Sequence, residues 1–280
     1  MTATSAFPAA LADAFREDRI IDLTLPLAED LPCTWPGHML YQHKTFTWFE
    51  QQRGGWGSVA NRTGAPYQTR WLCIDEHTGT HLDAPSHFVP RPDSGLPNAG
   101  AAGVVGMADV PVAQTAGPAA VIDSSGLAES GDGGRSPRIT ADHVRRWEDV
   151  HGPIGAGEVV LFASGWDRRY RAGPDGAGYA HAALVDRRGP GWPAPDADAI
   201  GLLVQRGVRC VGTDGVSMGP ADDGAPTHLA GLTHGQVFVE CLAQLHRLPP
   251  RGAFFLFLGL RIVDGTGGPG RAIALLPEGG

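Results

Sequence analysis

The segment His77-Thr-Gly-Thr-His81-Leu-Asp83-Ala-Pro-Ser-His87 places three histidines and one aspartate within eleven residues, in a chain that has 11 histidines among 280 residues. Neutral imidazole and carboxylate are the usual nitrogen and oxygen ligands of zinc, and they also suit manganese or iron. The four side chains fall at even offsets, so a fully extended strand would point them to one face. That strand would separate His77 from His81 by about 13 Å, which is too far for two ligands of one ion.

The segment must therefore bend, and Gly79 supplies the backbone freedom for a bend. A continuous helix would bring His77 and His81 onto one face, but Gly79 weakens a helix and Pro85 ends it. We predict a bent, partly irregular segment whose side chains converge on a metal ion. The alternative is a polar loop in which histidines cluster without a ligand. The helical His-Glu-x-x-His pattern of zinc proteases is absent here.

Seven positions of this segment, His77-x-Gly79-Thr80-His81-x-Asp83-x-Pro85-x-His87, resemble the signature of the cyclase-like metal-hydrolase family. That family includes bacterial kynurenine formamidase, isatin hydrolase and aromatic polyketide cyclases. The resemblance covers approximately residues 19–276. It implies an α/β (mixed) fold of the swivelling β/β/α type, with a mixed β core and flanking helices. It also implies a homodimer or homotetramer.

The resemblance extends to a second metal-binding segment, in which the family has a His and a Glu separated by eleven residues. His228 and Glu240 have this spacing. We predict a helix over 233–245, with Thr233 as its N-cap, that places Glu240 among apolar neighbours. A buried carboxylate is costly unless it is paired or binds a metal. The alternative is an exposed helical glutamate without a ligand.

By this resemblance, His77, His81 and Asp83 hold one divalent ion, and Asp83 bridges to a second ion held by His228 and Glu240. Some relatives use one ion, so one or two ions of zinc or manganese per subunit are expected.

His87 matches the catalytic histidine of the family. We assign it general acid–base duty, because the pKa of imidazole lies near the working pH. The expected function is a metal-dependent hydrolase that opens an amide, cyclic amide or lactone bond of an aromatic or apolar small molecule with metal-activated water. One alternative is an aldol-type cyclase acting on an aromatic polyketide intermediate. Another is a non-catalytic metal- or ligand-binding protein, against which the presence of His87 argues.

Aromatic side chains near the motif are candidates for the pocket wall. The Pro-Gly loop that carries Trp35, and a Ser-Gly-Trp segment that carries Trp166, resemble segments that lie near the family's active site. The candidate walls are Trp35, Trp48, Phe49, Phe88 and Trp166. For the tryptophans, packing in the core is the alternative. The Gly-rich stretch 54–57, within residues 50–66, predicts a lid over the pocket.

Composition predicts a soluble globular protein, and the length allows one large domain or two small ones. Because the two metal-binding segments lie about 150 residues apart with no linker between them, we predict a single domain spanning residues 1–280. The formal net charge of −8 argues against nucleic acid or an anionic membrane as the main partner. The resemblance implies a small-molecule substrate. The N-terminus lacks the pattern of a signal peptide, and no run of 18 apolar residues predicts a membrane span. The four cysteines are widely separated and predict reduced thiols of a cytoplasmic protein.

Periodicity and turn residues predict the remaining elements. The predicted strands are 19–24, 44–48, 67–74, 119–123, 158–163, 209–212, 253–263 and 272–276, with two short ones at 104–107 and 109–112. The predicted helices, besides 233–245, are 9–16, 140–151 and 194–206. The stretch 253–263 is too apolar to expect half exposure, so we predict a central strand or a subunit interface. Residues 265–271 are expected to form a Gly-rich loop.

Overall fold

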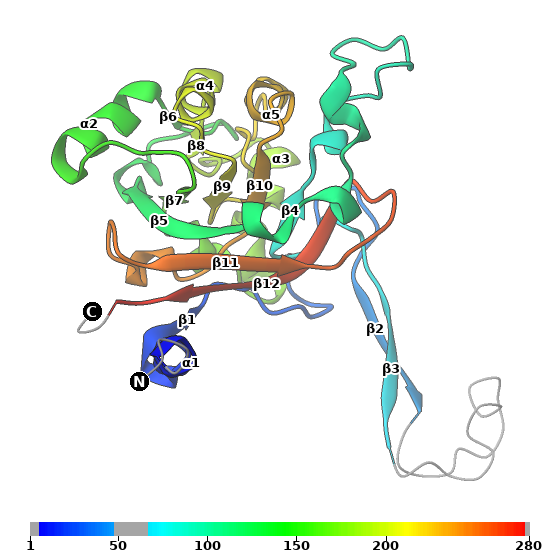
Figure 1. Cartoon of the computed structure of the whole chain (residues 1–280). Coiled ribbons are helices and arrows are strands. Elements are labelled where there is room, and N and C mark those ends of the chain that lie inside the picture. The colour runs from blue at the N-terminus through cyan, green and yellow to red at the C-terminus, as the bar shows by residue number, and fades with distance from the viewer. Residues whose placement is uncertain (1–5, 48–66, 278–280) are drawn as a thin grey trace, which may run out of the picture.

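The computed structural model describes residues 6–47 and 67–277, and its centre is a mixed eight-stranded sheet (Figure 1). The strand order is β1-β12-β11-β5-β7-β9-β10-β4. Because β12 also pairs with β4, the sheet closes on itself into a barrel-like ring with β1 attached to β12. The strands are β1 (Ile20–Asp22), β4 (His81–Asp83), β5 (Ala116–Asp123), β7 (Val159–Ala163), β9 (Cys210–Thr213), β10 (Val237–Glu240), β11 (Phe254–Gly259) and β12 (Gly267–Leu275).

Helices cover one face of the parallel part of this sheet, which consists of β5, β7, β9 and β10 (Figure 1). The α-helices are α1 (Ala6–Ala14), α2 (Ala141–His151), α3 (His181–Leu184), α4 (Ala197–Gln205) and α5 (Ala225–Leu232). Two short strands, β6 (Arg138–Ile139) and β8 (Ala194–Pro195), pair beside them. The predicted mixed α/β class is confirmed.

Strand β7 shows why this part of the sheet is buried on both faces. All five of its side chains are buried. Side chains alternate along a strand, so Leu161 packs inside the ring while Val160 and Phe162 pack under α2 and α4. A strand that is covered on both faces has a continuous apolar sequence, as this strand does. Two apolar cores, one on each face, therefore hold the strands that carry the site.

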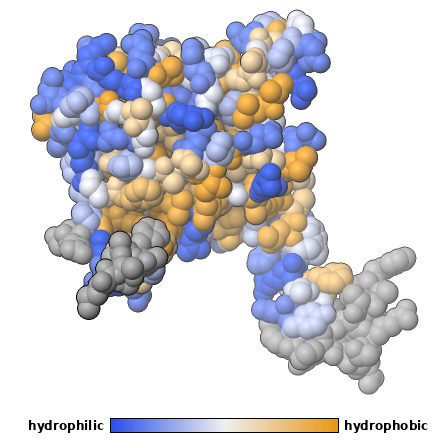
Figure 2. Space-filling model, in the orientation of Figure 1, coloured by the Kyte–Doolittle hydropathy of each residue, from blue (hydrophilic) through white to orange (hydrophobic). Residues whose placement is uncertain are grey.

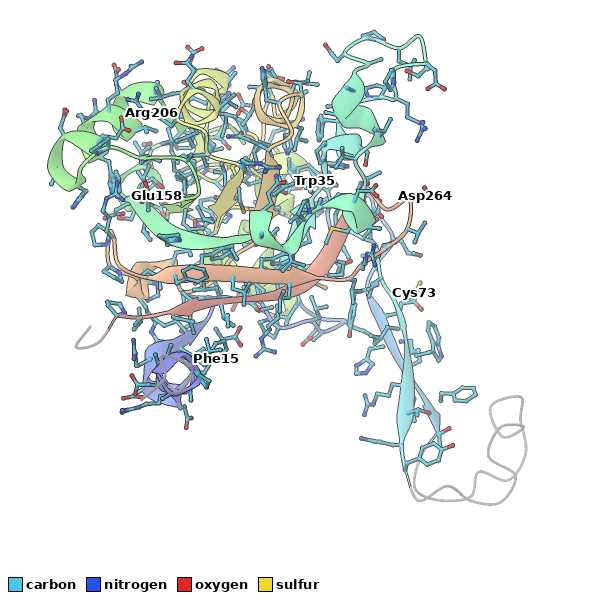
Figure 3. The ribbon with its side chains drawn as sticks, in the orientation of Figure 1. Phe15, Trp35, Cys73, Glu158, Arg206 and Asp264 are labelled. Carbon is cyan, nitrogen blue, oxygen red and sulfur yellow. The ribbon has the colours of Figure 1, made fainter. Side chains whose placement is uncertain are left out.

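A two-stranded hairpin projects from this body (Figure 1). It consists of β2 (Gln42–Thr47) and β3 (Thr69–Cys73), and its side chains include the exposed Trp71 and Leu72. Figure 3 shows Cys73 at the end of β3 that lies nearest the body. The predicted pocket residues Trp48 and Phe49, and the predicted lid at 50–66, lie outside the described residues.

The predicted helix over 233–245 is wrong. Helix α5 ends at Leu232, and Gly235 then adopts a positive φ of 76°, which an L side chain rarely adopts. The following Val-Phe-Val run forms β10 and is fully buried, as β-branched and aromatic residues favour. Glu240 is therefore at the end of a strand rather than on a helix.

Two other predictions are corrected. Residues 101–114 contain three 3-10 turns in place of the two short strands. Most of the expected Gly-rich loop at 265–271 is strand, because β12 begins at Gly267. The small residues there let β12 approach β4 closely. Strand β11 lies between β12 and β5 in the sheet, as one of the two predicted alternatives had it. Phe254 and Leu258 on its outer face are 42% and 52% exposed in the single chain, so the other alternative, a subunit interface, stays a prediction.

The other predicted strands and helices are present with boundary shifts of a few residues. Helix α4 starts at Ala197 rather than at the predicted residue 194, and the Asp196 carboxylate caps it by accepting a hydrogen bond from the Ala199 N–H. Among the described residues, no helix is long and apolar enough to cross a membrane.

Candidate metal centre

The motif bends as its glycine predicts. Gly79 has a φ of +59°, β4 follows it, and a 3-10 turn over Pro85–His87 ends the segment. The second half of the site arrives by strand pairing, because β10 runs antiparallel to β4 and places Glu240 opposite His81. Helix α5 supplies His228. Two rigid strands and one helix thus bring together residues that lie about 150 positions apart in sequence.

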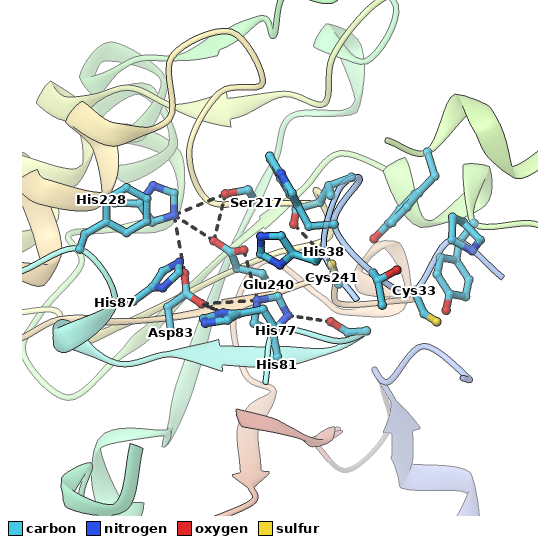
Figure 4. A pocket seen from close by; sticks show the side chains of 18 residues that line it. Cys33, His38, His77, His81, Asp83, His87, Ser217, His228, Glu240 and Cys241 are labelled. Carbon is cyan, nitrogen blue, oxygen red and sulfur yellow. Dashed lines mark hydrogen bonds and ion pairs between the residues drawn. The ribbon is translucent and has the colours of Figure 1, made fainter. Parts of the chain in front are cut away.

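Asp83 lies at the middle of the cluster (Figure 4). Its Oδ1 is 2.8 Å from His77 Nδ1 and 3.4 Å from His81 Nε2, and its Oδ2 is 3.6 Å from His228 Nε2. The Glu240 carboxylate closes the group, with Oε1 3.3 Å from His228 Nε2 and Oε2 3.5 Å from His81 Nε2. The structure therefore brings together all five residues that the sequence predicted as metal ligands.

Backbone carbonyls orient two of the histidines. The ring nitrogen Nδ1 of His81 lies 2.7 Å from the Gly79 carbonyl oxygen, and that of His228 lies 2.8 Å from the Gly224 carbonyl oxygen. A carbonyl only accepts, so each Nδ1 carries the proton. Each ring consequently presents Nε2 to the carboxylates, which is the arrangement that prepares a histidine to bind a metal.

Burial and mutual contact shift the pKa values of the cluster. Burial would lower the pKa of His81 and His228, yet their bonds with Asp83 and Glu240 raise the pKa of His81 well above its usual range and that of His228 to about 10. Burial would raise the pKa of Asp83, but interaction with the nearby His87 and hydrogen bonds with the other histidines hold it well below its usual range. The pKa of Glu240 is also lowered, by His228 and His81 against burial and the charge of Asp83.

These shifts mean that the two carboxylates stay ionised in a buried site and attract positive charge. No lysine or arginine is among the described residues that line the cavity. Compensation has to come from protons on the imidazoles or from a cation that replaces those protons. Buried carboxylate and imidazole donors, with the ligand atoms of His81, Asp83 and Glu240 within 4.8 Å of one another, fit a divalent metal.

His87 lies beside this cluster. Its ring centroid is 4.0 Å from that of His77, and its ligand atom falls in a second group with His77 and Asp83. Burial lowers the pKa of His87 despite the opposing charge of Asp83, which favours a neutral imidazole. Phe88 packs edge-on against His87 and stacks on His228 at 4.1 Å.

A cavity of about 300 Å³ opens above these groups. Trp35 and Phe88 line it, as predicted, together with Tyr170 and Val216. Trp166 does not line it. Its indole is fully buried and donates a hydrogen bond to the Tyr179 carbonyl, so it packs in the core behind the wall.

Ser217 and His38 also line the cavity, although the sequence did not predict either of them as a site residue. Ser217 contacts both His228 Nε2, at 3.4 Å, and Glu240 Oε1, at 3.3 Å. His38, at the end of the Trp-Pro-Gly loop, lies at the mouth, with Nδ1 3.2 Å from Asp75 Oδ2. The Trp-Pro-Gly loop could have pointed to His38, but nothing in the sequence indicated that Asp75 is the partner of His38.

The chain is similar to known proteins in both sequence and structure. The model of the Cyclase family, described as "Putative cyclase", matches residues 21–220. The isatin hydrolase of Roseibium aggregatum is 34% identical over 221 residues, which cover 77% of each chain. The kynurenine formamidase of Salinibacter ruber is 29% identical over 241 residues, which cover 85% of this chain and 89% of that protein.

Among solved structures, isatin hydrolase A from Labrenzia aggregata bound to benzyl benzoate superposes with a TM-score of 0.76 and 28% identity, over 98% of this chain and all of that one. The match of the family model covers well over half of the chain, and these relatives are hydrolases by name. The chain therefore belongs to the cyclase family of metal-dependent hydrolases.

Proposed function

We propose that this enzyme hydrolyses an amide, cyclic amide or lactone bond of a small aromatic or apolar molecule. The observation that carries the proposal is the cluster of two buried carboxylates and four imidazoles beneath an aromatic-walled cavity. The names of the relatives support hydrolysis, since one is an isatin hydrolase and the other a kynurenine formamidase.

The metal in this proposal is zinc or manganese, as one or two ions, held by His77, His81, Asp83, His228 and Glu240. Asp83 would contribute both of its oxygens to such a site, because one faces His77 and His81 while the other faces His228. A divalent cation held there polarises an acyl oxygen and lowers the pKa of water.

His87 is the proposed general acid–base. No ring nitrogen of His87 has a hydrogen-bond partner among the described residues, and its ring lines the cavity. A neutral imidazole in that position can take the proton from the attacking water and return it to the leaving nitrogen or oxygen. Phe88 fixes the ring from one side.

The walls of the cavity set the proposed substrate class. Trp35 and Phe88 offer flat apolar surfaces to an aromatic ring. A volume of about 300 Å³ lies at the lower end of the range for small-molecule sites, which favours a one- or two-ring substrate over a polycyclic one. This argues for hydrolysis over the alternative, aldol-type cyclisation of an aromatic polyketide.

Hydrolysis assays with metal analysis test the proposal. Purified protein should hold one or two equivalents of zinc or manganese and open isatin, N-formylkynurenine, or simple aryl esters and lactones, and a chelator should stop turnover. His87→Ala should lose most of its turnover, by about 10²-fold or more, yet keep its metal. Asp83→Ala should lose the metal as well. Near-full activity of His87→Ala would remove His87 from the mechanism, and bound metal without hydrolysis of any of these compounds would favour the cyclase.

We also propose that the single domain assembles as a homodimer or homotetramer in the cytoplasm. Apolar side chains gather over the outer face of β11 (Figure 2), and Trp71 and Leu72 of the hairpin are exposed. Such surfaces usually mark contacts between proteins. All four cysteines are free, which suits a reducing compartment. Sedimentation at several protein concentrations tests the assembly, and a monomer throughout would contradict it.

A further inference from the structure

His77 differs from His81 and His228 in the group that holds its ring in place. Its Nε2 lies 3.1 Å from the Thr266 hydroxyl oxygen rather than from a backbone carbonyl. Thr266 comes from the turn between β11 and β12 and is 189 residues away from His77 in sequence. The Thr266 hydroxyl in turn reaches the carboxylate of Glu76, the residue that precedes the motif.

The direction of the protons in this chain of contacts follows from the donors. An ionised carboxylate only accepts, and Glu76 accepts from both the hydroxyl and the backbone N–H of Thr266, the latter at 3.1 Å from each carboxylate oxygen. The hydroxyl proton therefore points at Glu76, and the Thr266 oxygen is left as an acceptor for His77. Consequently His77 Nε2 carries a proton.

The other nitrogen of His77 is then the one available to a cation. Nδ1 faces Asp83 Oδ1 at 2.8 Å, inside the ligand cluster. His81 and His228 present Nε2 to the same carboxylates, so His77 must enter the centre with the opposite ring nitrogen. A ring free to adopt the other tautomer would point an N–H at the cation site.

We propose that Glu76 and Thr266 are positioning residues that fix the tautomer and orientation of His77, and that the metal affinity of the centre depends on them. The inference rests on the proposed function only in that the centre binds a divalent metal. Loss of such a partner of a metal-ligating histidine typically weakens metal binding by about 10–100-fold.

The local structure allows a clean test at Thr266. Its backbone N–H is held by Glu76, and its carbonyl accepts from the Ala84 N–H at 2.9 Å, so the turn is anchored without the hydroxyl. Thr266→Val replaces the hydroxyl with a methyl group of the same shape and leaves His77 Nε2–H without its acceptor. Thr266→Ser keeps the hydroxyl. Thr115→Val is a matched control, because the Thr115 hydroxyl is buried and bonded to the Phe257 carbonyl, away from the cluster.

The measurement is the dissociation constant of Co²⁺ and Zn²⁺ for metal-stripped protein, from the Co²⁺ absorption spectrum and from competition with a chelator. Thr266→Val should weaken binding by about 10–100-fold, while Thr266→Ser and Thr115→Val should stay within about threefold of the unmodified protein. Circular dichroism of the metal-free variants checks that each is folded.

Glu76→Gln provides a second, independent variant. A glutamine amide next to the Thr266 N–H frees the hydroxyl to donate to His77, which favours the wrong tautomer. This change should also weaken Co²⁺ binding, and the double variant with Thr266→Val should be no weaker than Thr266→Val alone, because Glu76 acts through Thr266. Metal binding by Thr266→Val and Glu76→Gln equal to that of the unmodified protein would overturn the inference while leaving the proposed function intact. Failure of the unmodified protein to bind any divalent metal would overturn both.

Discussion

Gly267 offers a way to disturb the centre by packing alone. It lies in β12 opposite Asp83, and a Cβ built on it would meet His77 Cε1 at 2.5 Å and His77 Nδ1 at 2.9 Å. The same Cβ would lie 2.9 Å from the Leu82 carbonyl oxygen, which belongs to the paired strand β4. Pairing with β4 holds the strand at this position, so Gly267→Ala must displace the imidazole.

The size of the effect follows from the distances. Ordinary contact begins at 3.4 Å, so the His77 ring has to move by about 1 Å. Forcing one methyl group into such a site costs about 1–3 kcal/mol of folding stability. A displacement of about 1 Å at a catalytic centre can reduce turnover by about 10²-fold. We therefore expect kcat/KM of Gly267→Ala to fall by about 10²-fold, with weaker metal binding.

The assay is hydrolysis of the best substrate at saturating zinc or manganese, with thermal unfolding of the same samples. Gly201→Ala is the control, because a Cβ at Gly201, within α4, meets nothing within 4 Å. That change should leave turnover unaltered and add up to about 1 kcal/mol of stability through helix propensity. Turnover of Gly267→Ala within threefold of the unmodified enzyme would refute the packing argument.

Three further predictions address stability and metal dependence. Removal of the metal with a chelator should lower the unfolding temperature, since a ligand at about 1,000 times its Kd contributes about 4 kcal/mol, and no shift on chelation would contradict a resident metal. Asp196→Ala should cost about 1 kcal/mol in urea unfolding, because it removes the N-cap of α4, and an unchanged midpoint would contradict the cap. The hydrogen bond from Arg138 lowers the pKa of Asp222 to about 2, so this pair stabilises the fold above the ordinary carboxyl range and is lost as the pH falls towards 2. Because Asp222 is largely exposed, Asp222→Asn should cost less than about 1 kcal/mol at pH 7 and nothing near pH 2, and equal costs at both pH values would contradict the assignment.

Much of the centre could be predicted from local sequence. The motif from His77 to His87 concentrates ligand-type side chains that can converge only if the stretch bends, and Gly79 supplies the backbone freedom for that bend. The spacing of His228 and Glu240 matched a family pattern. Periodicity describes only neighbours along the chain, so it could not show which residues His228 and Glu240 contact in the fold.

Local reasoning failed where the helix and strand signals compete. The run around Val237 has apolar residues at helical spacing as well as β-branched and aromatic side chains, and short apolar runs leave this choice open. The closed sheet decided it, because β9 and β4 offer backbone partners on both sides of β10. Similarly, the glycines of residues 265–270 predicted a loop. In the structure β12 begins at Gly267, because its small residues allow close pairing with β4.

The sequence by itself determined the chemistry of the donors, the bend that gathers the first four of them and the mixed α/β class. Only the tertiary structure decided which ring nitrogens face the carboxylates, that Trp166 is buried in the core, and that Glu76 and Thr266 reach His77. The physical reason is that side-chain chemistry and backbone sterics are local properties. Hydrogen-bond direction in a buried cluster depends on donors and acceptors that the closed sheet brings together from distant parts of the chain.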